Sequence, residues 1–142
     1  MFRIMLAEDN PGDVLLFREA LRTRGIPCEL AVAEDGHKAI AMLRAAVDGA
    51  TATPDLIILD VNLPKHNGNV VLREVRSRDS LAGVPVIMLT SSASPTDRQA
   101  SKNLGANLYI QKSSNLDELL EIGRIVEEFL HRKSPSSPPL PK

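Results

Sequence analysis

Five short apolar runs alternate along the chain with five stretches whose apolar residues recur at helical spacing. The run at residues 56–59 contains no polar residue, which is typical of a parallel strand covered on both faces. The apolar runs are residues 2–7, 29–33, 55–60, 84–90 and 108–110. Helical spacing is found over residues 13–24, 39–46, 70–78, 96–104 and 116–131.

This alternation predicts an α/β fold in which one parallel sheet carries helices on both faces. Right-handed crossovers leave few arrangements for five β-α units. The flavodoxin-like (βα)5 doubly wound parallel sheet, with strand order 2-1-3-4-5, is the common one at this size. We expect one domain over residues 1–131. Residues 132–142, rich in proline and serine, are expected to form a disordered tail.

Polar side chains stand where the expected strands end, and ligands of open α/β sheets bind beyond that edge. Three carboxylates there would repel one another, and a hard divalent cation such as Mg²⁺ would relieve the repulsion. A hydroxyl and an amine could then hold a phosphoryl group on a carboxylate nucleophile. The residues are Glu8, Asp9, Asp60, Thr90 and Lys112. Glu34 and Asp35 follow the second run at an edge of the sheet and are interpreted as solvated turn residues.

Composition and charge narrow the classes of partner. The formal net charge is −1 and aromatic residues make up 3% of the chain, which supports neither attraction to nucleic acid nor base stacking. No apolar run approaches the roughly 18 residues of a membrane span. Glu8 and Asp9 interrupt the short apolar start, unlike a signal peptide. We therefore expect a cytoplasmic protein that binds neither nucleic acid nor membrane.

Five motifs resemble those of the receiver domains of bacterial two-component response regulators. They are Leu-Ala-Glu-Asp-Asn at 6–10, Leu-Ile-Ile-Leu-Asp at 56–60, Leu-Pro-Lys-His-Asn-Gly at 63–68, Val-Ile-Met-Leu-Thr-Ser at 86–91 and Gly-Ala-Asn-Leu-Tyr-Ile-Gln-Lys at 105–112. Their order, spacing and strand positions all agree, over residues 2 to about 131. The resemblance implies a phosphoacceptor signalling protein rather than an enzyme. Such a protein receives a phosphoryl group from a sensor histidine kinase and signals by protein contact or phosphorelay.

The same resemblance implies a role for each residue of the site. Asp60 matches the phosphoacceptor, and Tyr109 matches an aromatic switch that turns inward when Thr90 moves. A strand aromatic packed on a helix is the simpler interpretation of Tyr109. The other matches are Asp9 as a direct Mg²⁺ ligand, Glu8 as a ligand acting mostly through water, Asn62 as a backbone-carbonyl ligand, and Thr90 and Lys112 as the groups that bind the phosphoryl oxygens.

One position departs from the family pattern. Proline with a cis peptide usually follows the lysine, whereas Ser113 follows Lys112 here. A cis bond before a residue other than proline costs about 2.5–4 kcal/mol. The Lys112–Ser113 bond is therefore either trans or strained, and the sequence leaves both open.

Residues 10–13, the long loop before the third strand and the lack of an output domain resemble the small regulators partnered with bacterial phytochrome histidine kinases. Single receivers of the chemotaxis type are the alternative. Only 11 residues follow position 131, too few for a DNA-binding helix pair. The output is therefore expected to be a protein contact or onward transfer of the phosphoryl group.

The last helical stretch has an unusually wide apolar surface. On a helical projection its apolar arc covers about 220°, whereas a helix packed on one side needs only about 100°. Part of the arc should be exposed on a monomer, which predicts a homodimer through Ile122, Ile125 and Phe129. Deeper burial of this helix within the domain is the alternative.

Three other functions compete with that of a phosphoacceptor. A pseudo-receiver, which keeps the fold but binds proteins without being phosphorylated, is the main alternative. A phosphatase of the haloacid dehalogenase type needs a second aspartate two residues after the nucleophile, where Asn62 stands. A flavin-binding protein of the same sheet order needs a phosphate-binding loop after the first strand, where Glu8 and Asp9 would repel phosphate.

Overall fold

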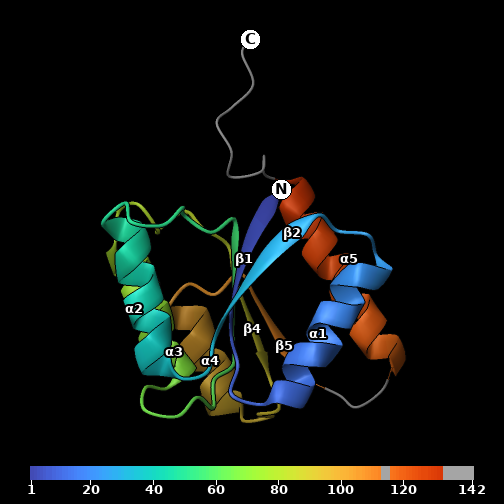
Figure 1. Cartoon of the computed structure of the whole chain (residues 1–142). Coiled ribbons are helices and arrows are strands. Elements are labelled where there is room, and N and C mark those ends of the chain that lie inside the picture. The colour runs from blue at the N-terminus through green and yellow to red at the C-terminus, as the bar shows by residue number, and fades with distance from the viewer. Residues whose placement is uncertain (113–115, 133–142) are drawn as a thin grey trace.

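The computed structural model describes residues 1–112 and 116–132, with the backbone alone over 116–119. The predicted alternation of strands and helices is confirmed (Figure 1). The strands are β1 (Phe2–Ala7), β2 (Cys28–Ala33), β3 (Leu56–Leu59), β4 (Val86–Thr90) and β5 (Leu108–Gln111). The helices are α1 (Pro11–Thr23), α2 (Gly36–Val47), α3 (Gly68–Ser77), α4 (Pro95–Asn103) and α5 (Leu116–His131).

The strands form one parallel sheet in the order β2-β1-β3-β4-β5, as predicted. Strand β1 pairs with β3 from Ile4–Leu56 to Ala7–Leu59, so these two strands end side by side. Strand β4 reaches Thr90 opposite Gln111 of β5. Residues that follow the strands are thereby brought to one edge of the sheet, although they lie far apart in the sequence.

The sheet divides the core into two layers. Helices α2, α3 and α4 cover one face, and α1 and α5 cover the other (Figure 1). Alternate residues of β3 serve the two layers: Ile57 and Leu59 pack with α2 and α3, whereas Leu56 and Ile58 pack with α1 and α5. All four are at most 1% exposed, and burial of each stabilises the fold by roughly 1.5–3 kcal/mol. The prediction that this strand is covered on both faces is confirmed.

The loop after β3 is fixed by two close backbone approaches. The N–H of Gly68 donates to the carbonyl of Val61 at 2.9 Å, and a Cβ at position 68 would lie 2.0 Å from the carbonyl oxygen of Asp60. The N–H of Gly36 donates to the carbonyl of Pro64 at 3.0 Å, and a Cβ there would lie 2.1 Å from the carbonyl oxygen of His66. Glycine is needed at both positions because no side chain fits between these backbones.

The caps of α1 and α2 show why these helices begin before the predicted stretches at 13 and 39. Helix α1 begins at Pro11 rather than Asp13, because Asn10 caps it by accepting from the N–H groups of Gly12 (2.9 Å) and Asp13 (3.2 Å). Proline is well suited to the first helical position, where no N–H is needed. Asp35 is not a solvated turn residue. It is 7% exposed and caps α2 by accepting from the N–H of Lys38 at 2.7 Å.

Helix α5 uses much of its apolar arc within the domain. Ile122 is only 7% exposed and belongs to the core layer shared with α1. Ile125 and Phe129 are partly buried and pack against the same layer. Over the described residues, no helix combines the length and the apolar character needed to cross a bilayer.

Candidate functional site

Three carboxylates meet where β1 and β3 end. Ligand oxygens of Glu8, Asp9 and Asp60 all lie within 4.8 Å of one another. Glu8 and Asp60 are 4% and 5% exposed, whereas Asp9 is exposed. Buried carboxylates this close repel one another unless a cation compensates them. The grouping predicted from the strand ends is therefore present, and its oxygen atoms suit a hard divalent cation such as Mg²⁺ or Mn²⁺.

Lys112 supplies a positive charge to this cluster from the end of β5. Its Nζ contacts Oε1 of Glu8, lies 3.0 Å from Oδ2 of Asp60 and lies 2.9 Å from Oδ2 of Asp13. The backbone N–H of Lys112 donates to the carbonyl of Thr90 at 2.6 Å, which anchors the lysine to β4. The lysine side chain is 15% exposed.

Burial and hydrogen bonding shift the pKa values of Lys112 and Glu8. Burial lowers the pKa of the Lys112 ammonium, but its hydrogen bonds to the three carboxylates outweigh burial and raise the pKa above its ordinary value. Burial raises the pKa of the Glu8 carboxyl, and the hydrogen bond from Lys112 opposes that rise without cancelling it. Lys112 is thus a permanent cation at neutral pH.

Asp60 is oriented from two sides. Its Oδ1 accepts the backbone N–H of Asn62 at 3.0 Å, while its Oδ2 faces Lys112. Asn62 itself is exposed in the loop that Gly68 holds against the end of β3. The carboxylate therefore sits in a defined position beside both the acidic cluster and the lysine.

Thr90 ends β4, the strand paired with β3 on the side away from β1, and Tyr109 lies on β5 beyond it. Thr90 is fully buried, and its Oγ1 accepts the N–H of Ser92 at 3.2 Å. The Tyr109 hydroxyl donates to the carbonyl of Ser92 at 3.0 Å, and the guanidinium of Arg98 lies 5.0 Å from its ring centre. Tyr109 is half-buried against the α2–α3 core layer. The simpler interpretation, an aromatic packed on a helix, accounts for the ring but not for the hydroxyl.

The Lys112–Ser113 bond stays a prediction. The described residues contain no cis peptide bond, but Ser113 lies outside them.

The contact between Asp13 and Lys112 is not among the predictions from the sequence. The sequence places Asp13 at the start of a helix and within the motif at 10–13, but nothing in that local pattern shows that the first turn of α1 faces the end of β5.

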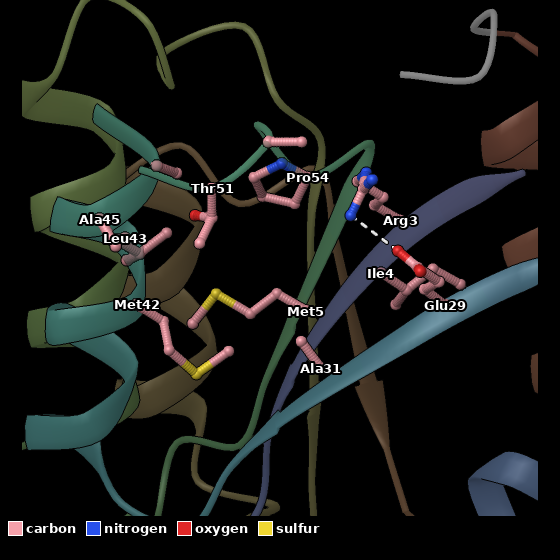
Figure 2. Close-up of a pocket in the computed structure, with 12 residues that line it drawn as sticks. Arg3, Ile4, Met5, Glu29, Ala31, Met42, Leu43, Ala45, Thr51 and Pro54 are labelled. Carbon is pink, nitrogen blue, oxygen red and sulfur yellow. Dashed lines mark hydrogen bonds and ion pairs between the residues drawn. The ribbon is translucent and has the colours of Figure 1, made fainter. Parts of the chain in front are cut away.

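One apolar cavity lies away from the acidic cluster. It has a volume of about 250 Å³ between α2 and strands β1 and β2, and Met5, Ala31 and Met42 line it (Figure 2). Arg3 and Pro54 at its rim stand at the beginning of β1 and just before β3. The cavity therefore opens away from the acidic cluster and has no part in the site.

The fold and the site together define a receiver: a buried aspartate at the end of the central strand, an acidic cation cluster, a lysine and a buried threonine. The family model for the response regulator receiver domain matches residues 4–124. The chain belongs to this family, as the motifs predicted.

Its relatives include response regulators of phytochromes. The chain is 39% identical over 127 residues to the response regulator Rcp1 of Synechocystis sp., covering 89% of this chain and 86% of Rcp1. It is 43% identical to the phosphorylated cyanobacterial phytochrome response regulator RcpA, with a TM-score of 0.81 and coverage of 90% and 92%. The Mn²⁺-bound form of Rcp1 also gives a TM-score of 0.81, at 38% identity and coverage of 91% and 94%. The resemblance expected from residues 10–13 is thereby confirmed.

Proposed function

We propose that Asp60 accepts a phosphoryl group from the phosphohistidine of a sensor histidine kinase. An oxygen of Asp60 forms a bond to phosphorus as the bond from the histidine nitrogen breaks. Water later attacks the phosphorus, which restores the carboxylate and releases phosphate. The observation that carries this proposal is the position of Asp60. It is 5% exposed, oriented by the N–H of Asn62 and placed between Lys112 and two further carboxylates.

The neighbouring residues have distinct proposed roles. Glu8, Asp9 and Asp60, with the backbone carbonyl of Asn62, would hold Mg²⁺, which neutralises charge on the phosphoryl oxygens when bound. Lys112 pairs with a phosphoryl oxygen, and the Thr90 hydroxyl donates to another. The choice of a divalent cation is supported by the three converging carboxylates and by the Mn²⁺-bound form of Rcp1.

The switch proceeds from Thr90 to Tyr109. When the Thr90 hydroxyl turns toward the phosphoryl group, it loses its hydrogen bond from the N–H of Ser92. The carbonyl of the same Ser92 accepts the hydrogen bond of the Tyr109 hydroxyl. The start of α4 at Pro95 follows directly. Phosphorylation would thereby change the surface formed by α4 and β5.

The net charge of the chain and its similarity to known response regulators support the proposed partners. A kinase of the phytochrome class is supported by the similarity to RcpA and Rcp1. The net charge of −1 favours a protein partner over nucleic acid, and a cytoplasmic location suits exchange with such a kinase. Residues 1–131 would act as the receiver domain. The proposed tail at 132–142 lies outside the described residues from position 133.

A homodimer through α5 is part of the proposal. Ile125 and Phe129 are half-buried and could each offer a partner their exposed part, and Leu120 on the same helix is 37% exposed. Ile122 is buried, so it would support this surface from beneath. Sedimentation of the chain and of a Phe129→Glu variant tests the dimer. A wild-type chain that stays monomeric across micromolar concentrations would rule it out.

The direct test of the function is intact mass after incubation with a small acyl-phosphate donor. We expect one added phosphoryl group that requires both a divalent cation and Asp60, and none on Asp60→Asn. A purified histidine kinase serves as the second donor. If neither donor modifies a folded wild-type chain, the phosphoacceptor proposal fails and the pseudo-receiver function takes its place.

A further inference from the structure

The Lys112 ammonium is shared among carboxylates of three separate elements. Glu8 follows β1, Asp13 lies in the first turn of α1, and Asp60 follows β3. An ammonium has three N–H donors, so this arrangement uses all of them. For Lys112 to hold a phosphoryl oxygen, at least one of these hydrogen bonds must be given up.

Asp13 differs from the other two partners. Glu8 and Asp60 also belong to the acidic cluster whose ligand oxygens lie within 4.8 Å of one another, and among the described residues Asp13 does not. A cation held by that cluster would share Glu8 and Asp60 with the lysine. Asp13 is therefore the partner that stays with Lys112 alone.

The position of Asp13 is itself fixed by α1. Its backbone N–H donates to the side chain of Asn10 at 3.2 Å, and a carboxylate in the first turn is favoured by the helix dipole. The side chain is 36% exposed, so the Asp13–Lys112 pair is only partly screened by solvent. The backbone N–H of Asn10 in turn lies 3.2 Å from Oε2 of Glu8. The start of α1 therefore contacts the site twice, through Asn10 to Glu8 and through Asp13 to Lys112.

We infer that Asp13 is a positioning residue for Lys112. It holds the ammonium at the α1 side of the cleft when a cation occupies Glu8 and Asp60, so that the lysine meets the phosphoryl group from one fixed direction. This inference rests on the proposed phosphoacceptor function. A helix-stabilising carboxylate with no effect on Lys112 is the competing interpretation, and the experiment below separates the two.

The first readout needs no phosphorylation. An ammonium held by carboxylates exchanges its protons slowly, so Lys112 should give a side-chain NMR signal that a Lys112→Met variant lacks. In the wild-type chain we expect this signal to persist when Mg²⁺ alone is added. In Asp13→Ala we expect it without Mg²⁺, where Glu8 and Asp60 still hold the lysine, and expect its loss on adding Mg²⁺. Asp13→Asn, which keeps an oxygen acceptor without the charge, should be intermediate.

The second readout is the rate of phosphoryl uptake at saturating Mg²⁺. We expect Asp13→Ala to slow it about fivefold, as suits the loss of a partly exposed, charge-assisted hydrogen bond. Glu19→Ala is the matched control, because it removes an exposed carboxylate of the same helix that pairs, among the described residues, with Arg22 alone. We expect wild-type rates from it. Thermal unfolding of each variant shows whether α1 remains folded.

The outcomes separate the inference from the proposed function. If Asp13→Ala keeps both the ammonium signal in Mg²⁺ and the wild-type rate, Asp13 does not position the lysine, and the phosphoacceptor function stands. If the wild-type chain takes up no phosphoryl group while the signal behaves as expected, the function fails and the positioning role of Asp13 remains. Where Asp13→Ala fails to fold, the signal of Asp13→Asn in Mg²⁺ decides: a signal equal to wild type overturns the inference.

Discussion

Thr90 and Tyr109 lie on neighbouring strands and are joined through the backbone of one residue, Ser92. The Ser92 N–H donates to Oγ1 of Thr90 at 3.2 Å, and the Ser92 carbonyl accepts from the Tyr109 hydroxyl at 3.0 Å. In the proposed switch, a movement of the Thr90 hydroxyl would reach Tyr109 through the backbone of this one residue.

This relationship predicts the effect of Tyr109→Phe. The ring keeps its packing, but the bond to Ser92 is lost, so we expect the free energy of unfolding to fall by about 1 kcal/mol. Uptake of a phosphoryl group on Asp60 should be unchanged, because no group that touches the carboxylate is altered. Chemical denaturation and intact mass measure the two effects. Arg98→Ala, which removes only the cation over the ring, is the control, and a large loss of uptake in Tyr109→Phe would contradict the assignment.

Gly68→Ala should be severely destabilising. Its Cβ would lie 2.0 Å from the carbonyl oxygen of Asp60, so either the loop or the end of β3 must shift. We expect a loss of about 3 kcal/mol or more, at the upper end of overpacking costs. Gly83→Ala is the matched control, since a Cβ there meets no atom within 4 Å. Equal stability of the two variants would contradict the prediction, because it would show that the loop after β3 can shift at little cost in free energy.

The stability of the fold should also depend on Arg76, which lies away from the site. Its guanidinium donates to the carbonyls of Ala82, Val84 and Gly105 and to the side chain of Asn107, at 2.7–3.0 Å. Burial lowers the pKa of this guanidinium. We expect Arg76→Ala to lower the free energy of unfolding by about 3 kcal/mol, because the part-buried bond to the Val84 carbonyl and the bonds to three further acceptors are lost together. Urea unfolding measures this change, and Arg73→Ala, an exposed arginine of the same helix, should be within about 0.5 kcal/mol of wild type.

The cap of α2 predicts a pH dependence of stability. The N–H of Lys38 holds the pKa of the Asp35 carboxyl below its usual range. A lowered pKa in the folded state means that Asp35 stabilises the fold above the ordinary aspartate pKa. This contribution is lost as the pH falls through the lowered value. Asp35→Ser keeps a capping oxygen but cannot titrate. We expect its unfolding free energy to decline less than that of wild type between pH 7 and pH 3, and parallel declines would refute the assignment.

The fold was largely predictable because each strand and helix has a local pattern. The apolar run at 56–59 became β3, and the helical spacing at 116–131 became α5 with the same bounds. The strand ends then placed Glu8, Asp60, Thr90 and Lys112 at one edge, because parallel strands must end together. The differences lie at boundaries. Helix α1 begins at Pro11, two residues before the predicted start at position 13, and Asp35, predicted to be solvated, caps α2.

The contacts that no local pattern encodes were missed. Asp13 meets Lys112 from 99 residues away, and Arg76 joins the loop between α3 and β4 to the loop between α4 and β5. Such side-chain meetings depend on the relative placement of helices and loops, which periodicity does not report. The burial of Ile122 of α5 against α1 is a further contact of this kind. An apolar arc shows how much surface a helix can bury, but only the neighbouring α1 shows how much of it is buried within the domain.

The complete burial of β3 has a consequence for timing. Its residues are at most 1% exposed and are paired on both sides with β1 and β4, so their amide hydrogens should exchange with solvent only through global unfolding. Asp60 directly follows this strand, while Tyr109 and α4 lie nearer the surface. Local fluctuations of Tyr109 and α4 would therefore leave the proposed acceptor Asp60 in place. The duration of a signal would then be set by the chemistry of the acyl-phosphate bond, not by the breathing of the protein around it.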